Sequence, residues 1–280
     1  MPELPEVETI RSRLAPGLTG RRFERVRIRD ARLTRPEPPE AVASALEGER
    51  VADVRRRGKY LIVVFESGRL LLVHLRMTGN VLHPAPEGAE DDPHVRAVVN
   101  LDNGEDVAYR DVRRFGTWEL IQPGELEEYF AARRLGGEPL EATFTAAALE
   151  AGLAGRRAPV KAALLDQRSV AGIGNIYADE ALWYARLHPL TPAGALGRRE
   201  LAALRSGIRK ALELGIARQG ATLRDYRGAG GERGRMQHEF RVYGRAGEPC
   251  RRCGTPIEKI RAGGRGTWFC PGCQRLPRPR

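Results

Sequence analysis

The amino terminus, Met1-Pro2-Glu3, places a potential amine nucleophile beside a carboxylate. If Met1 is removed, which is usual before a residue as small as proline, the chain begins with a secondary amine. A terminal amine has a pKa of about 8, roughly two units below a lysine side chain, so more of it is unprotonated at neutral pH. Its condensation with an aldehyde carbon gives a cationic iminium that promotes elimination at the adjacent carbon. Glu3 is then a candidate proton donor or acceptor.

The same stretch also fits the start of a helix. Pro5 suits a first helical turn, and Glu6 and Glu8 suit the positive end of the helix dipole. One face of that helix is apolar, with residues at helical spacing: Val7, Ile10 and Leu14. The amino terminus therefore has a structural interpretation as well as a chemical one.

All the cysteines of the chain follow a metal-ligand pattern, C-x2-C-x16-C-x2-C, formed by Cys250, Cys253, Cys270 and Cys273. Two such turns each direct a pair of thiolates at one tetrahedral zinc ion, and the intervening residues suit a β-hairpin. Disulfides are the alternative, but they are rare inside cells. Four sulfur ligands leave no open coordination position, so one structural Zn²⁺ is predicted. Arg265 lies on the predicted hairpin, where it can bind a backbone phosphate.

Lys59 is a second candidate for proton chemistry. It follows Arg55-Arg56-Arg57-Gly58 and opens an apolar strand, and lysine occurs elsewhere only at positions 161, 210 and 259. Unlike arginine, a lysine can lose its proton when cationic neighbours lower its pKa. The alternative is a solvated cation at the end of a strand.

Two segments that end in glycine, residues 74–79 and 111–116, each follow a predicted strand and so form loop tips. They carry a flexible Met77, a cationic Arg113 and an aromatic Phe115. Placed together, these side chains can enter a duplex where a nucleotide has been extruded and replace the lost stacking. The alternative is that Met77 and Phe115 belong to the core.

Two kinds of periodicity divide the chain. Apolar patterns in the first half predict one short helix at 40–46. They predict strands at 23–28, 51–54, 60–66, 69–74, 95–101, 106–109 and 117–121. This half is a β-sandwich or barrel capped by helices. From about residue 125 the spacing is helical, with Gly172-Ile173-Gly174-Asn175 forming a double turn between two helices. Asn175 is the predicted N-cap of the second, whose free amides also suit a phosphate.

Composition points to a nucleic-acid partner. The chain has 280 residues, a net charge of +11 and a pI of about 10.1, and residues 218–280 carry 15 Lys and Arg against 5 Asp and Glu. A polyanion is the natural partner, and no basic amphipathic anchor accompanies the charge. There is no secretory signal, and the longest apolar runs are strand-sized. We therefore expect a cytoplasmic protein with no membrane partner.

Together these motifs resemble the bacterial formamidopyrimidine-DNA glycosylase family along essentially the whole chain. Pro2-Glu3-Leu4-Pro5-Glu6 is similar to the family's amino terminus, residues 172–178 to its helix-two-turn-helix signature, and the four cysteines to its zinc finger. We expect an α+β multidomain fold. Residues 1–125 form an N-terminal β-sandwich catalytic domain with an N-terminal helix, 126–217 a helix-two-turn-helix domain, 218–245 a lesion-capping loop and linker, and 246–280 a β-hairpin zinc finger.

The resemblance implies a bifunctional DNA repair glycosylase and AP lyase, acting as a nucleoid-associated monomer on duplex DNA that contains oxidised bases or abasic sites. It would excise oxidised purines, 8-oxoguanine and formamidopyrimidines, and cut the strand by β- and δ-elimination, with no cofactor for the chemistry. The implied catalytic residues are Pro2, Glu3, Lys59 and Arg265. The implied void-filling trio is Met77, Arg113 and Phe115, and the implied further DNA contacts are His94, Arg114, Arg156, Lys161, Asn175 and Tyr243.

Three positions depart from the family's pattern: Arg76 in place of a usual glycine, Val112 in place of a usual proline, and a Gly- and Arg-rich sequence in the predicted lid, residues 221–235. The lid departure bears on base selectivity. One alternative is therefore a glycosylase of the same fold that prefers oxidised pyrimidines. Another is a catalytically silent DNA-binding zinc protein.

Overall fold

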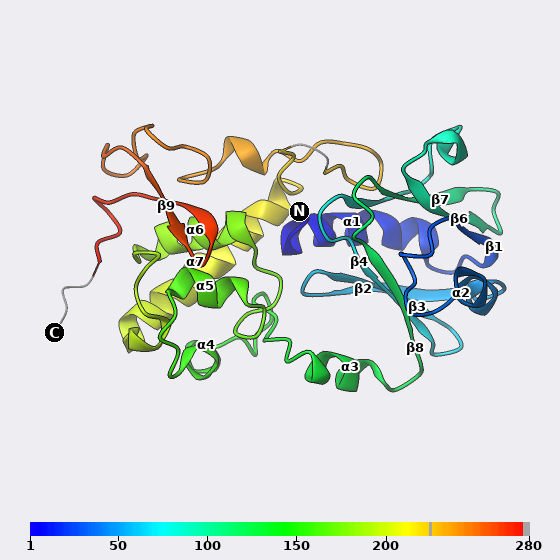
Figure 1. Cartoon of the computed structure of the whole chain (residues 1–280), viewed down its shortest axis with the longest axis horizontal. Helices are drawn as coiled ribbons and strands as arrows, with labels where there is room; N and C mark the ends of the chain where they lie inside the picture. Colours follow the sequence, from blue (N-terminus) through cyan, green and yellow to red (C-terminus); the bar gives the residue numbers. More distant parts are fainter. Residues whose placement is uncertain (224–225, 277–280) are drawn as a thin grey trace. The chain divides into compact units, whose positions relative to one another are not determined.

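The computed structural model describes residues 1–223 and 226–276 (Figure 1). The chain divides into two compact units, each discontinuous in sequence. The first unit comprises Met1–Ala131 and Arg218–Arg235, and the second comprises Ala132–Ala217 and Met236–Arg280. The segment 218–235, which includes the predicted lid, therefore belongs to the first unit.

The described part of the first unit contains two four-stranded antiparallel sheets. One sheet has the strand order β1 (Phe23–Ile28), β6 (Val95–Leu101), β7 (Asp106–Asp111) and β5 (Gly79–Leu82). The other has the order β2 (Val51–Arg57), β3 (Tyr60–Phe65), β4 (Leu70–His74) and β8 (Thr117–Ile121). Two helices accompany the sheets, α1 (Leu4–Leu18) and α2 (Pro39–Leu46).

One apolar core fills the space between these two sheets and α1. It takes Leu61 and Val73 from one sheet and Val99 from the other, all nearly inaccessible to solvent. The predicted apolar face of α1, Val7, Ile10 and Leu14, is part of the same core. In Figure 1 α1 lies beside β2 and β3, against which it packs. The first unit is thus the predicted β-sandwich with an amino-terminal helix.

Strand β5 was not predicted from the sequence. Glycine and asparagine, which begin it, are poor strand formers, but its pairing with β7 from Gly79↔Asp111 to Leu82↔Ala108 supplies the backbone hydrogen bonds. Only glycine fits at position 79. A Cβ there would lie 2.5 Å from both the Leu75 carbonyl oxygen and the Tyr109 hydroxyl.

The second unit is helical and ends in a hairpin. Helix α3 (Leu126–Ala132) leads into it, and its further elements are α4 (Ala146–Leu153), α5 (Val160–Leu165), α6 (Asn175–Ala185), α7 (Arg198–Ala217), β9 (Glu258–Ala262) and β10 (Arg265–Phe269). Helices α6 and α7 approach closely at Gly207, where a Cβ would lie 2.5 Å from the Ala181 carbonyl oxygen. The predicted α+β class is confirmed. Among the described residues, no helix has the length and apolar character of a membrane span.

Candidate active site and nucleic-acid interface

The start of α1 holds the predicted nucleophile and its carboxylate in place. Pro2 is buried, Glu3 is 2% exposed, and Pro5 lies in the first turn. The Glu3 backbone N–H donates to the Glu6 Oε2 atom at 2.8 Å, which is one half of a capping box. The fold therefore holds Pro2 and the Glu3 carboxylate together at the start of α1.

Glu6 is a site residue that the sequence analysis missed, because it was interpreted only as a partner of the helix dipole. Its second carboxylate oxygen accepts the backbone N–H of Ala221 at 2.8 Å, so it ties α1 to the first residue of the predicted lid. The Tyr226 hydroxyl donates nearby to the Gln219 carbonyl oxygen at 3.2 Å. Gly220 has φ +76°, and a Cβ there would lie 2.8 Å from the Glu6 Cγ atom. The start of the predicted lid is therefore hydrogen-bonded to the amino-terminal helix.

Lys59 and His74 lie together at the ends of β3 and β4. Lys59 is 6% exposed, follows the left-handed Gly58 (φ 57°), and precedes Tyr60, which pairs with His74. The His74 Nδ1 atom accepts the Arg76 backbone N–H at 3.0 Å, so its ring is neutral in this arrangement. Burial, with smaller effects from the Arg76 and Lys59 charges, lowers the pKa of His74 to about 3.

This shift makes the stability of the first unit depend on pH. The unfolded chain binds a proton at His74 near its ordinary pKa of 6.5, whereas the folded chain does not until about pH 3. The stabilisation is therefore present above pH 6.5 and is lost as pH falls below it, by about 1.4 kcal/mol per pH unit. We expect the free energy of urea unfolding to fall more steeply between pH 6.5 and 5 in the wild type than in a His74→Gln variant, in which His83, whose pKa burial also lowers, still titrates. Equal slopes in the two proteins would contradict the assignment.

The predicted void-filling trio lies on two neighbouring loops of the first unit, one between β4 and β5 and the other between β7 and β8. Phe115 is 52% exposed, Arg113 is exposed, and Met77 is half-buried. The Arg113 guanidinium lies over the Phe115 ring, 4.8 Å from its centroid. Arg76 has φ 53°, a conformation that favours glycine, so its place in the loop explains why a glycine is usual there. The core alternative therefore fails for Phe115.

Two predicted DNA contacts lie in the first unit, and the Arg114 side chain already has a partner within the protein. The Arg114 Nε and Nη2 atoms donate to the two carboxylate oxygens of Asp30 at 2.5 and 2.8 Å. This pair lowers the pKa of the buried Asp30, while 41% of the Arg114 side chain stays exposed to a phosphate. His94 is half-buried, and its carbonyl oxygen accepts the Asp111 N–H at 2.9 Å. Their DNA contacts stay predictions.

In the second unit, a buried ion pair holds the zinc hairpin against the helices. The Lys161 Nζ atom is 2.7 Å from the Asp179 Oδ1 atom, and both side chains are fully buried. Lys161 also donates to the Gly266 carbonyl oxygen at 2.9 Å, and Asp179 Oδ2 accepts the Trp268 N–H at 3.1 Å. Gly266 is adjacent to the exposed Arg265. Because Lys161 binds the Gly266 carbonyl oxygen, it fixes the hairpin backbone beside Arg265. Its direct contact with DNA stays a prediction.

The N-cap interpretation of Asn175 is wrong by one residue. Gly174 is the N-cap of α6, and Asn175 is the first residue of the helix. The Asn175 side chain does not cap α6, and its Nδ2 atom donates to the Gly266 carbonyl oxygen at 3.1 Å. Asn175 and Lys161 thus bind the same atom of the hairpin.

Tyr243 and Arg156, the remaining predicted contacts, are both half-buried. Glu180 is fully buried and accepts the backbone N–H groups of residues 241–243, which fixes the backbone at Tyr243. Burial raises the pKa of Glu180, and these three hydrogen bonds oppose the rise. The Tyr243 ring is 4.5 Å from that of Trp268 on the hairpin. Arg156 forms an ion pair with Asp166.

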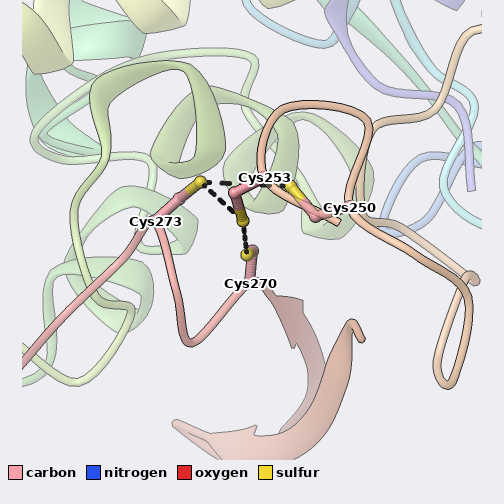
Figure 2. A group of neighbouring side chains, drawn as sticks. All are labelled: Cys250, Cys253, Cys270 and Cys273. Carbon is pink, nitrogen blue, oxygen red and sulfur yellow. Dashed lines mark hydrogen bonds between the residues drawn. The ribbon is translucent and has the colours of Figure 1, made fainter. Parts of the chain in front are cut away.

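The four cysteines form a site that fits one zinc ion. Figure 2 shows their side chains converging from the loop before β9 and from the end of β10. All four sulfurs lie within 4.8 Å of one another, and the distance from Cys253 to Cys270 is 3.4 Å. A tetrahedral ion with Zn–S bonds of about 2.3 Å requires sulfurs about 3.8 Å apart, whereas a disulfide requires about 2.05 Å. The four cysteines are free thiols here, so zinc is supported over disulfides.

The sandwich, the helix-two-turn-helix and the four-cysteine finger define a multidomain DNA-binding zinc protein. Three family models match the chain in the same order. They are the formamidopyrimidine-DNA glycosylase N-terminal domain at residues 1–118, the formamidopyrimidine-DNA glycosylase H2TH domain at 135–227, and the zinc finger found in FPG and IleRS at 247–276. The chain belongs to the formamidopyrimidine-DNA glycosylase family.

Relatives and solved structures agree over almost the full length. The chain is 47% identical to a formamidopyrimidine-DNA glycosylase of Chloroflexus aggregans, covering 99% of each chain. It resembles a Lactococcus lactis Fpg variant in complex with DNA containing Fapy-dG, with 36% identity, a TM-score of 0.89, and coverage of 98% and 100%. It also resembles MutM in complex with DNA containing carbocyclic 8-oxo-G, with 36% identity, a TM-score of 0.88, and the same coverage.

Proposed function

We propose that this protein excises oxidised purines, 8-oxoguanine and formamidopyrimidines, from duplex DNA and then cuts the strand at the abasic site. The observation that carries the proposal is the full-length match to this family, which begins at the first residue of the chain. Solved relatives bound to Fapy-dG and 8-oxo-G DNA support the substrate class. The buried Glu3 carboxylate at the start of α1 supports the chemistry.

In the proposed reaction, the Pro2 nitrogen bonds to C1′ of the damaged nucleotide as the bond from C1′ to the base breaks. Glu3 transfers a proton to the ring oxygen, the sugar opens, and an iminium forms between Pro2 and C1′. The Glu3 carboxylate left by that transfer accepts a C2′ proton as the 3′ phosphate leaves, and a second elimination, in which the C4′ proton passes to water, expels the 5′ phosphate. We assign the protonation of leaving groups to Lys59 and the binding of a backbone phosphate to Arg265. Every step is a proton transfer or an elimination, so the proposed chemistry uses no cofactor.

The void-filling trio completes the proposal. Met77, Arg113 and Phe115 would occupy the gap left by the everted nucleotide, with Arg113 facing the orphan cytosine. Extrusion costs a few kcal/mol and stacking recovers about 1–3 kcal/mol per base, so the exposed Phe115 offsets much of the cost. The zinc hairpin and the helix-two-turn-helix would hold the backbone. We also propose that the protein acts as a monomer on nucleoid DNA in the bacterial cytoplasm.

Borohydride trapping tests the proposed function. With a duplex that carries 8-oxoguanine opposite cytosine, reduction should yield a covalent complex of protein and DNA linked through Pro2, and the intact protein should lack Met1 by mass spectrometry. An oxidised thymine duplex should be cut much more slowly. A reversed preference would identify the pyrimidine-specific alternative, and binding without any adduct would leave a silent DNA-binding protein.

A further inference from the structure

One buried carboxylate joins the two loops that carry the trio. Asp111, the last residue of β7, is 1% exposed. Its Oδ1 atom accepts the Thr78 hydroxyl and the Arg113 N–H, the latter at 3.2 Å. Its Oδ2 atom accepts the N–H groups of Phe115 and Gly116 at 2.9 and 2.8 Å. The Thr78 Oγ1 atom also accepts the Arg113 N–H at 2.9 Å, which closes the link between the loops.

The same two loops rest on one buried tyrosine. A Cβ at Gly79, which follows the first loop, would lie 2.5 Å from the Tyr109 hydroxyl, and a Cβ at Gly116, which ends the second, would lie 1.7 Å from it. Tyr109 is 1% exposed, and its ring meets that of Trp118 edge-on at 5.6 Å. Both loops therefore pack against Tyr109, which leaves no room for a side chain at either glycine.

We propose that Asp111 and Thr78 are positioning residues that hold the two loops in one fixed arrangement. This arrangement determines how strongly the protein discriminates between bases opposite the lesion. The inference rests on the proposed function, because it takes Met77, Arg113 and Phe115 as the gap-filling side chains. The backbone of these loops is hydrogen-bonded to the buried Asp111, while the Arg113 and Phe115 side chains are exposed to solvent. A fixed Arg113 presents its donors in one register and matches one base edge. A loosened loop adapts to either base, which lowers selectivity more than affinity.

Thr78→Val is the sharpest test, because it keeps the side-chain volume and removes only the hydroxyl that links the loops. We expect the ratio of kcat/KM for 8-oxoguanine opposite cytosine to that opposite adenine to fall about fivefold to tenfold, the size of one hydrogen bond. The variant loses the bond from Thr78 to Asp111, whereas the Arg113 N–H that Thr78 also accepts keeps its bond to Asp111 Oδ1. Thr78→Ser keeps the hydroxyl and should restore the ratio. Asp111→Asn, which places an amide donor among four donors, should lower the ratio at least as much. If Asp111→Asn does not fold, the threonine pair still decides the question.

Thr34→Val is the matched control. Thr34 is 1% exposed, and its hydroxyl donates to the carbonyl oxygen of Glu37, a residue of neither loop, at 2.9 Å. This variant should lose stability without changing the ratio. An unchanged ratio in Thr78→Val, or an equal fall in Thr78→Ser, would overturn the inference. If the wild-type protein forms no borohydride adduct, the proposed function itself fails. If the wild type forms the adduct and discriminates between the opposite bases, but Thr78→Val has the same ratio, only the positioning role of Thr78 and Asp111 is refuted.

Discussion

Replacing Pro2 by glycine is expected to lower kcat/KM for an 8-oxoguanine duplex by at least about 1000-fold, which corresponds to about 4 kcal/mol of transition-state stabilisation. Glycine leaves a primary amine, whose imine can lose its proton and so ceases to be a permanent electron sink. It also frees the backbone at a position that the proline ring restricts, so the nitrogen is less well oriented for attack. Borohydride trapping should fall in parallel with cleavage, because both pass through the same iminium.

Single-turnover cleavage of an end-labelled duplex measures this loss, and Pro5→Ala is its matched control. Pro5 lies in the first turn of α1, where it contributes to helix initiation and not to the proposed chemistry. Its replacement should leave cleavage within a few-fold of wild type. Binding to a duplex that contains a stable abasic-site analogue should survive in both variants. A Pro2→Gly protein that keeps a tenth or more of the wild-type rate would contradict the nucleophile assignment.

Replacing Cys270 by serine is expected to release zinc and to weaken DNA binding by about 100-fold, or about 2.7 kcal/mol. Cys270 is fully buried at the end of β10, so loss of its thiolate removes the ion that holds the two ends of the hairpin. Arg265 and Gly266 lie on that hairpin. Without the ion, the hydrogen bonds of Lys161, Asn175 and Asp179 would have to hold the hairpin, and the proposed phosphate contact of Arg265 would be lost.

Zinc content by atomic absorption and DNA affinity by fluorescence anisotropy at fixed salt measure these effects. The same affinity loss should follow treatment of the wild type with a chelator, and added zinc should restore the wild type but not Cys270→Ser. Hydrogen-exchange protection of β3 and β4 should be unchanged in the variant, because the sandwich has its own core. A variant that loses zinc and keeps full affinity would show that the hairpin is held without the metal.

The sequence by itself determined the secondary structure and the zinc site. Strand-sized apolar runs within 60–66 and 69–74 predict β3 and β4, helical spacing predicts α5 and α7, and the C-x2-C pairs predict one tetrahedral site. These signals are local, because strand and helix periods and ligand spacing extend over only a few residues. The exception, β5, shows the limit, since its strand conformation depends on pairing with β7 and not on its own composition.

Only the tertiary structure decided how the charged residues are used. The resemblance implies that Lys161 and Arg114 contact DNA, whereas folding buries Lys161 with Asp179 and pairs Arg114 with Asp30. Glu6 joins Ala221 across 215 positions of sequence, a distance at which no local pattern carries information. A buried charge must find a partner or lose its charge, and which partner it finds depends on the packing of whole sheets and helices. For that reason the candidate chemistry-bearing residues could be proposed from the sequence, while the residues that hold them, Glu6, Asp111 and Asp179, could not.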